Sequence, residues 1–427
     1  MLVIINKGLL EIYAMDSTPS VTKIKITREQ WPVGQGCFST CQIKATDKSF
    51  NYIYDCGTRS GYRNYLQQCL TEFNEKVKEI DALFISHLDE DHINGIEEVA
   101  KLFNVKKIYL PYIDLQEIIL IIGASSSNNE HSPKLMRFLV NPAIWLNSRG
   151  IEKIVMVKRH HDGKSYVNNF ESQVNDYSNK DSGIDNLSVY FRELQVASYF
   201  GPVAMTDDIL RVLYDRKVVW VLAPFVQPLP RLLSHSLKVA IRAEFKIDIN
   251  NHDLTSILTS KSSRSALKKI YESLCGNHNN SSLCLYSGMF PFDNQSKMHN
   301  DISTKGRFFK PNLVTVNKSG WLGTGDISLK SKTVRDTFYS YYDQVLKEIC
   351  TFMLPHHGSG YNINSEIFSN IAPTIAFANA GSKRDYGHPH EQVVKMVTDH
   401  GIKFHHIDER RRTKLKEELQ IQIDDKG

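Results

Sequence analysis

The feature that most constrains this chain is a short run of histidines and aspartates directly after an apolar segment. Residues 82–86, Ala-Leu-Phe-Ile-Ser, have the composition of a short buried strand, and His87-Leu88-Asp89-Glu90-Asp91-His92 follows them. A segment with helical spacing, residues 93–105, begins just beyond. Side chains able to bind a metal are therefore concentrated where one strand ends and a helix begins.

Carboxylates and imidazoles this close together repel or desolvate one another unless a cation neutralises them. We predict a metal site in which His87 and Asp89 bind one ion while Asp91 and His92 bind a second. Two ions in a hydrolytic site lie about 3.5–4 Å apart and activate the water between them. The competing interpretation is a solvated polar loop that happens to be rich in Asp and His.

Six further motifs follow one another along the chain, and their order is more specific than any one of them. They are Val33-Gly34-Gln35-Gly36-Cys37, Tyr54-Asp55-Cys56-Gly57, Asn279-Asn280-Ser281-Ser282-Leu283, Gly323-Thr324-Gly325-Asp326, His356-His357-Gly358-Ser359 and Tyr386-Gly387-His388-Pro389. With the run at 87–92, this order resembles the ComEC-type competence proteins of the metallo-β-lactamase superfamily. The resemblance covers most of the chain except its middle. It implies an α/β fold, the αββα metallo-β-lactamase sandwich, with an inserted segment.

The resemblance also implies roles for single residues. Asp326, which alone could be a turn residue after Gly-Thr-Gly, is expected to bridge two ions. Asp55 is expected to support the ligands, although a turn-stabilising Asp is an equal alternative. It stays open which residue of the pair His356 and His357 binds metal, and whether His388 is a ligand or the acid for the leaving group. The predicted ligands are His87, Asp89, Asp91, His92, Asp326, His357 and His388, and the predicted catalytic residues are Asp91, His356, His357 and His388.

Two departures from the family pattern bear on the metal. Asp89 stands where the family usually has its second histidine, and a carboxylate ligand favours Mn²⁺, Fe²⁺ or Mg²⁺, although Zn²⁺ accepts carboxylates too. Cys37 stands where an aspartate often follows Val-Gly-Gln-Gly. We expect two divalent ions, with Zn²⁺ and Mn²⁺ as the leading candidates.

Apolar runs divide the chain into three parts. Residues 22–112 and 216–427 alternate short strands with amphipathic helices, and we predict that they form the two halves of the core. Residues 113–215 are polar and turn-rich, which predicts an insertion that shapes access, binds a protein partner or is a tolerated surface elaboration. Within it, 192–205 and 207–217 are predicted as amphipathic helices. Gly36 and Gly57 are expected at turns that require positive φ.

Composition limits the setting of the protein. A net charge of +5 over 427 residues permits a polyanionic substrate without requiring one. The 7 cysteines contain no CxxC pair, which fits free thiols in a reducing cytosol better than a disulfide scaffold. The first residues lack the features of a signal peptide or a membrane span. We therefore expect a cytoplasmic protein without membrane segments.

The predicted ions would make water nucleophilic, with His356, His357 or His388 stabilising charge or protonating the leaving oxygen. The resemblance implies a phosphodiesterase or nuclease acting on nucleic acid or nucleotides. Basic segments such as 383–384 and 410–414 are compatible with this, although short basic runs are usually solvated surface. The alternatives are hydrolysis of a lactone, amide or thioester, and a non-catalytic metal-binding module for a protein partner. A ComEC-like hydrolase without membrane helices also resembles components of bacterial multi-gene systems, some concerned with phage defence.

Overall fold

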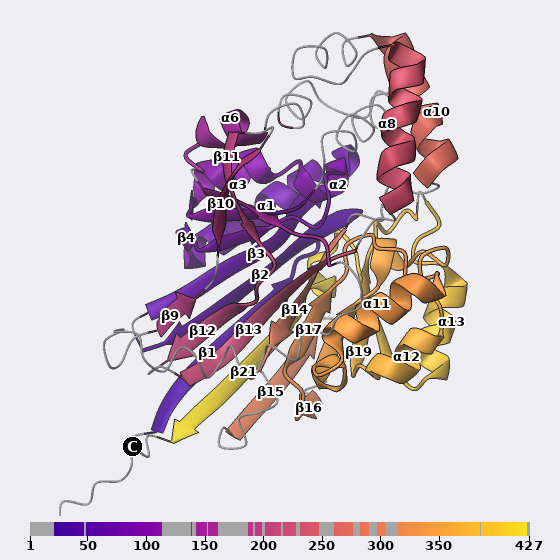
Figure 1. The fold of residues 1–427 in the computed structure, drawn as a ribbon. Helices are drawn as coiled ribbons and strands as arrows, with labels where there is room; N and C mark the ends of the chain where they lie inside the picture. The colour runs from indigo at the N-terminus through magenta and orange to yellow at the C-terminus, as the bar shows by residue number, and fades with distance from the viewer. Residues whose placement is uncertain are drawn as a thin grey trace, which may run out of the picture.

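Two β-sheets packed face to face form the centre of the protein, for which we use a computed structural model (Figure 1). The structure describes residues 21–46, 48–112, 138, 142–151, 153–160, 187–190, 193–198, 201–214, 217–227, 231–246, 260–275, 282–289, 297–304, 314–384 and 386–424. In these ranges the first sheet has 11 strands, in the order β10 (Leu194–Ser198), β11 (Gly201–Thr206), β8 (Lys153–Val157), β7 (Lys107–Pro111), β5 (Ala82–Phe84), β3 (Lys48–Thr58), β2 (Gly36–Ala45), β1 (Val21–Gln30), β21 (Leu415–Asp424), β15 (Lys297–Thr304) and β16 (Val314–Val316).

The second sheet has 8 strands within the same ranges. Their order is β20 (Lys403–Ile407), β19 (Ile375–Asn379), β18 (Ile349–Met353), β17 (Gly320–Gly323), β14 (Leu283–Gly288), β13 (Lys217–Val226), β12 (Leu210–Tyr214) and β9 (Leu187–Tyr190). The strands β17, β18, β19 and β20 run parallel to one another. Their carboxyl ends therefore meet at one edge region of the sheet. A separate short pair joins β4 (Glu79–Ile80) to β6 (Asn104–Val105).

Helices cover the outer faces of both sheets (Figure 1). The first sheet is covered by α1 (Arg63–Lys76), α3 (Ile96–Leu102) and α6 (Pro142–Asn147), and the second by α11 (Lys332–Tyr342), α12 (Glu366–Ile371) and α13 (Glu391–Asp399). Two further helices, α8 (Arg231–Phe245) and α10 (Lys261–Cys275), pack against each other. The short helical elements are α2 (Glu90–Ile93), η1 (Ser60–Tyr62), η3 (Leu346–Glu348), η4 (Pro355–Gly358) and η5 (Arg411–Thr413). The architecture is the αββα sandwich that the sequence predicts.

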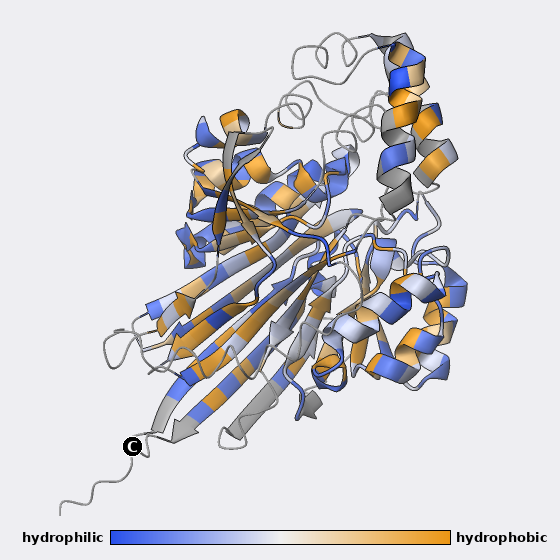
Figure 2. Cartoon of the chain, viewed as in Figure 1, coloured by the Kyte–Doolittle hydropathy of each residue, from blue (hydrophilic) through white to orange (hydrophobic). Residues whose placement is uncertain are grey.

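Alternating side chains explain why the layers form. Ile24 and Ile26 of β1 are fully buried between the sheets, whereas Lys23 and Lys25 lie at the alternate positions. Figure 2 shows the same alternation as bands of polar and apolar residues along β21. Trp220 of the second sheet is fully buried in this inner layer. Burial of such apolar area stabilises the fold by about 25 cal/mol per Å².

A buried ion pair within the first sheet is hydrogen-bonded to the second sheet. Arg28 of β1 donates hydrogen bonds to Glu417 of β21 at 3.1 Å and to the carbonyl of Ser287 in β14 at 2.9 Å. The hydroxyl of Thr351 in β18 donates to the same Glu417 oxygen at 2.5 Å. Both charged side chains are 1% exposed. The pair therefore fixes how one sheet sits on the other.

An amphipathic helix in the first part of the core is confirmed, and two predicted helices are wrong. Helix α1 buries one apolar face, with Leu66, Leu70 and Phe73. Residues 192–205 and 207–217 instead contain β10, β11, β12 and the first residue of β13. Short apolar runs do not contain enough residues to show whether their hydrophobic pattern is that of a helix or of a buried strand. Within the described residues, strands from 113–215 therefore join both sheets.

Several other predictions concern residues outside the described ranges. Most of 113–215, and residues 279–281 of the predicted 279–283 motif, lie outside them, so the domain boundaries and a partner-binding insertion stay predictions. The thiols predicted to be free are so where the structure describes them, and all of these are buried: Cys37, Cys41, Cys56, Cys69, Cys284 and Cys350.

Removal of the carboxylate from the buried pair of Arg28 and Glu417 is predicted to destabilise the protein. Glu417→Ala leaves Arg28 buried without its carboxylate, so we expect the free energy of unfolding to fall by about 3–5 kcal/mol. Urea titration followed by tryptophan fluorescence measures this change. Glu418→Ala removes the neighbouring carboxylate, which is 40% exposed and pairs with Lys25 and Lys416. This control should change stability by less than about 1 kcal/mol, and equal losses in both variants would contradict the assignment.

Candidate metal centre

The predicted site residues lie at strand ends contributed by both sheets. His87 follows β5 of the first sheet, and Asp326 follows β17 of the second. His356 and His357 lie in η4 directly after β18, and His388 lies in the loop between β19 and α13. Segments far apart in the sequence are thus brought to one place because their strands end there.

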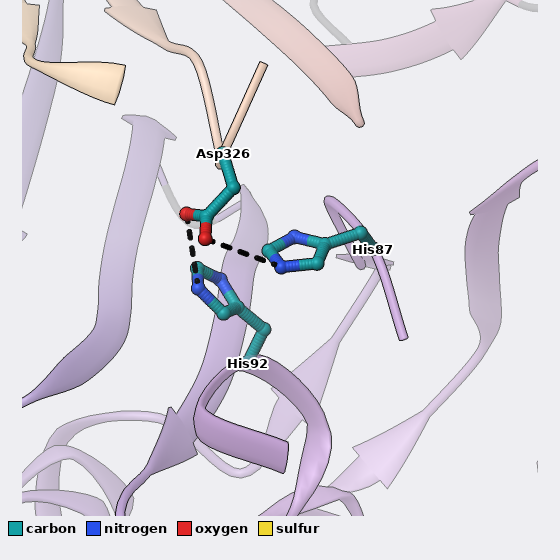
Figure 3. A group of neighbouring side chains, drawn as sticks. All are labelled: His87, His92 and Asp326. Carbon is teal, nitrogen blue, oxygen red and sulfur yellow. Dashed lines mark ion pairs between the residues drawn. The ribbon is translucent and has the colours of Figure 1, made fainter. Parts of the chain in front are cut away.

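A first group consists of His87, His92 and Asp326 (Figure 3). The Nε2 atom of His87 lies 3.6 Å from Oδ2 of Asp326, and Nε2 of His92 lies 3.4 Å from Oδ1. All three residues are buried, and their ligand atoms lie within 4.8 Å of one another. Two ligand atoms on one tetrahedral ion with bonds of about 2.1 Å are about 3.4 Å apart. The spacing therefore suits a single shared ion.

A second group consists of Asp91, His92 and His357, again buried and with ligand atoms within 4.8 Å. The Nε2 atom of His357 lies 3.2 Å from Oδ2 of Asp91 and 3.9 Å from Oδ1 of Asp326. His92 belongs to both groups. The grouping differs from the predicted division, in which His92 serves the second ion alone.

The imidazole nitrogens at the centre fit a bound cation. The Nε2 atoms of His87, His92 and His357 are buried, and none has a hydrogen-bond partner of acceptable geometry in the described ranges. A buried polar atom left in this way costs about 1–3 kcal/mol. Divalent ions held by the two groups would satisfy these atoms, with nitrogen and oxygen ligands that suit Zn²⁺ or Mn²⁺.

Each of these rings is held through its other nitrogen. The Nδ1 partners are Oδ2 of Asp55 at 2.8 Å for His92, Oγ of Ser86 at 2.9 Å for His87, and the carbonyl of Asn379 at 2.7 Å for His357. A proton on Nδ1 that is donated to Asp55 or Asn379 leaves the Nε2 lone pair facing the centre. Outer partners of this kind orient metal-binding histidines and raise their basicity.

A bulge in β3 directs Asp55 to this position. The register between β2 and β3 shifts between Phe38 and Ser39, and the extra residue on β3 is Asp55, with φ of 56°. Bulges redirect single side chains in this way. Asp55 is fully buried and accepts hydrogen bonds from the backbone N–H and the hydroxyl of Ser86, each at 2.7 Å, as well as from His92. These contacts support the orienting role expected for Asp55.

A close backbone approach explains Gly57, and the expected positive φ there is wrong. Gly57 is not among the described glycines with positive φ, whereas Gly36 is, at 153°. A Cβ on Gly57 would lie 2.4 Å from the backbone nitrogen of His92. The glycine therefore lets α2 pack directly on β3, which brings Asp91 and His92 to the centre.

The remaining predicted residues surround the two groups without belonging to them. Oδ2 of Asp89 lies 3.6 Å from Nε2 of His87, and its side chain is 27% exposed. His356 directs Nε2 toward Oδ2 of Asp326 at 3.6 Å and is 30% exposed at its side chain. The ring centroid of His388 lies 5.3 Å from that of His356 and 6.3 Å from that of His357. His357 rather than His356 thus takes part in a potential ligand group.

Burial and neighbouring charges set the protonation of these groups. Burial alone would raise the pKa of Asp326, but the surrounding imidazoles, that of His356 foremost, hold it well below its ordinary value. Burial likewise opposes the low pKa of Asp91, which the neighbouring imidazoles of His357, 3.2 Å away, and His92 bring to about 2. Burial and neighbouring imidazoles lower the pKa of His388 to about 3. At neutral pH the centre therefore holds two carboxylates beside a neutral His388.

The centre also attracts positive charge. Burial lowers the pKa of His92, but the carboxylates of Asp326 and Asp55 outweigh burial and raise it well above the ordinary value. A buried imidazole is drawn toward protonation only where the local potential is strongly negative. The same potential favours a divalent cation.

Residues that orient the ligands were not identified from the sequence. Ser86 directly precedes His87, Asn379 ends β19, and Oδ1 of Asn362 accepts a hydrogen bond from Nδ1 of His356 at 3.1 Å. A polar residue at the end of a buried strand is the signal that could have indicated Ser86 and Asn379.

One segment of the chain is similar to a known family. The metallo-β-lactamase superfamily matches residues 43–116, a span that includes β3, α1 and the run from His87 to His92. Over 90 residues the chain is 29% identical to ComE operon protein 3 of Bacillus subtilis (strain 168), which confirms the resemblance to the ComEC-type branch. That alignment covers 21% of this chain and only 11% of the relative.

Two solved structures also resemble the chain at low scores. A long form of RNase Z from yeast aligns with 84% of this chain and 36% of its own, at 10% identity and a TM-score of 0.29. A diphosphatase from the PhnP family aligns with 44% of this chain and 62% of its own, at 14% identity and a TM-score of 0.17. Neither likeness carries an argument about activity. The superfamily match at residues 43–116 and the two potential ligand groups support a metal-dependent hydrolase.

Helices long and apolar enough to cross a membrane are absent from the described part of the chain.

The outer contact of His92 gives a prediction for metal affinity. Asp55→Asn keeps the size of the side chain but removes the carboxylate that orients His92, so we expect affinity for Mn²⁺ or Zn²⁺ to fall about 10- to 100-fold. Competition with a fluorescent chelator measures this affinity, and circular dichroism checks the fold. Asp336→Asn, on a side chain of α11 that is 57% exposed, is the matched control and should bind like wild type. Unchanged affinity in Asp55→Asn would show that this contact does not orient a ligand.

Proposed function

We propose that this protein is a metal-dependent phosphodiesterase that acts on nucleic acid or nucleotides. The observation that carries the proposal is the convergence of three buried imidazole Nε2 atoms on the carboxylates of Asp91 and Asp326. The metallo-β-lactamase superfamily match at residues 43–116 supports hydrolysis, and the motif order that resembles ComEC-type proteins, which implies a nuclease, supports a phosphodiester substrate.

The chain offers ligands for two ions. His87 and Asp326 would hold one, and Asp91 and His357 the other, with the Nε2 atom of His92 free to complete only one of the two groups and with Asp89 and His388 as further predicted ligands. When bound, such ions polarise a phosphoryl oxygen and lower the pKa of water to near neutrality. Asp55, Ser86 and the carbonyl of Asn379 hold the imidazoles in place.

His356 is the residue we assign to the leaving oxygen. Its side chain is 30% exposed, so that a substrate can reach it, and its Nδ1 is held by Asn362 at 3.1 Å. A positioned imidazole can donate a hydrogen bond or a proton to an oxygen that develops negative charge. His388 lies beside it and would orient its ring.

The guanidinium of Arg59, beside Asp91, favours an anionic substrate over a lactone, amide or thioester. Nε of Arg59 lies 3.8 Å from Oδ2 of Asp91, and the Arg59 side chain is 36% exposed. Arginine binds phosphate through a planar fork of N–H donors. Arg59 can therefore hold a non-bridging phosphate oxygen close to the ions, where a neutral ester or amide would give it no partner.

Substrate profiling tests the proposed reaction. We expect the wild-type protein to cleave bis-p-nitrophenyl phosphate and at least one of single-stranded DNA, duplex DNA or RNA when supplied with Mn²⁺, Zn²⁺ or Mg²⁺. Asp91→Ala and Asp326→Ala should each reduce cleavage at least about 100-fold, because site residues act as a unit. Asp336→Ala serves as the control. Turnover of lactones or nitrocefin but of no diester would reject the phosphodiesterase.

Metal content tests the two-ion arrangement independently of activity. We expect elemental analysis of the loaded wild type to give about two transition-metal ions per chain. Asp326→Ala should lose at least one of them, because its carboxylate contacts His87 of one group and lies near His357 of the other. His400→Ala, an exposed histidine at the end of α13, is the control. One ion or fewer in wild type would contradict a dinuclear site.

A further inference from the structure

Two exposed tyrosines lie beside the candidate metal centre. Tyr361 is 78% exposed and Tyr386 is 46% exposed. In the described part of the chain, the other exposed tyrosine, phenylalanine or tryptophan side chain is Tyr65 on α1, at 40%. Aromatic rings exposed to water lack the stabilisation that burial would give them. The placement of these two tyrosines beside the candidate metal centre therefore points to a ligand.

The two tyrosines are joined by a continuous series of rings. The centroid of Tyr386 lies 6.5 Å from that of His388, His388 lies 5.0 Å from His390, and His390 lies 5.7 Å from Tyr361. We call these four side chains the aromatic strip. It reaches the candidate centre through His388, whose ring lies 5.3 Å from that of His356. The strip therefore leads from the surface to the residue assigned to the leaving oxygen.

Cationic side chains flank the aromatic strip. The guanidinium carbon of Arg59 lies 4.0 Å from the ring centre of Tyr386, Arg384 donates to the carbonyl of Pro389 at 3.3 Å, and Nζ of Lys330 donates to the carbonyl of Gly360 at 3.5 Å. Among the described residues, Arg384 forms an ion pair with Glu391 at 3.8 Å, and the Glu391 side chain is 91% exposed. Water and salt screen a carboxylate this exposed, so it leaves the positive character of the strip largely in place.

We propose that the aromatic strip binds single-stranded nucleic acid, with bases stacked on Tyr386 and Tyr361 and phosphates on Lys330, Arg384 and Arg59. This inference rests on the proposed phosphodiesterase and names its substrate class. Proteins that bind single strands combine stacking rings with a basic path along the backbone. Bases in a duplex are stacked on each other and cannot cover both tyrosines. A mononucleotide has one base and would leave one tyrosine unused.

Binding of a strand that resists cleavage tests the inference. We would measure fluorescence anisotropy of a labelled, phosphorothioate-linked oligothymidylate of about 15 nucleotides with the full-length, Mn²⁺-loaded protein. Tyr361→Ala and Tyr386→Ala should each weaken binding about 5- to 100-fold. Tyr361→Phe keeps the ring and should bind like wild type, as should Tyr65→Ala. Tyr386→Phe also keeps the ring but loses the hydrogen bond that Arg59 donates to the Tyr386 hydroxyl, so it should bind more tightly than Tyr386→Ala without necessarily matching wild type. Alanine variants that bind as tightly as the phenylalanine variants would overturn the stacking role.

Salt dependence separates the cations from the rings. Lys330→Ala should reduce the slope of log affinity against log salt concentration by about 0.7, the value for one lost contact to a single-strand phosphate. Tyr361→Ala should leave that slope unchanged, because stacking releases no counterion. A Lys330→Ala slope equal to that of wild type would remove Lys330 from the path. Tighter binding of a duplex of the same length would overturn the choice of substrate.

Failure of this inference and of the proposed function can be told apart. Hydrolysis of bis-p-nitrophenyl phosphate by wild type needs the ions and no base stacking. If wild type cleaves this small diester but single-strand binding ignores both tyrosines, the strip is rejected and the phosphodiesterase stands. If wild type cleaves no diester, the phosphodiesterase is rejected, and the anisotropy results decide alone whether the strip binds nucleic acid.

Discussion

Three buried aspartates impose the main constraint on the rest of the structure. Asp55, Asp91 and Asp326 are 0%, 7% and 3% exposed, and each lies within hydrogen-bonding or ion-pair distance of an imidazole. A buried carboxylate without compensation would take up a proton or destabilise the fold. The strands of both sheets must therefore end close enough to supply the compensating groups. The candidate centre is where this requirement is met.

Because of that requirement, each sheet supplies part of the side chains of the candidate centre. The first sheet supplies His87 and, through α2, Asp91 and His92, whereas the second supplies Asp326 and His357. A shift of one sheet against the other by a single residue, about 3.3 Å along a strand, would separate the two sets. The buried pair of Arg28 and Glu417, with its contacts to both sheets, resists such a shift. Stability and site geometry therefore depend on the same layer.

Sequence alone was most informative where one short segment carried both the structure and the chemistry. The run from His87 to His92 specifies a strand end, a helix start and potential ligands within a few residues, and the fold agrees with it. The pairing of His92 with two groups could not be foreseen, because it depends on the bulge at Asp55 and on the close packing of α2 against Gly57. Strands β10, β11 and β12 were missed because a buried strand of five or six residues shows no period of its own.

The pairing of β1 with β21 has a consequence for how the chain reaches its fold. Val21 pairs with Asp424 and Gln30 with Leu415, so the earliest described strand lies against the latest (Figure 1). During synthesis, β1 can pair with β2 as soon as that hairpin leaves the ribosome, but its other edge keeps unpaired backbone groups until residues 415–424 emerge. Arg28 likewise waits for Glu417. Nascent chains are therefore exposed to edge-to-edge aggregation from the synthesis of β1 until residues 415–424 emerge, and emergence of β21, rather than of the histidine run, completes the first sheet.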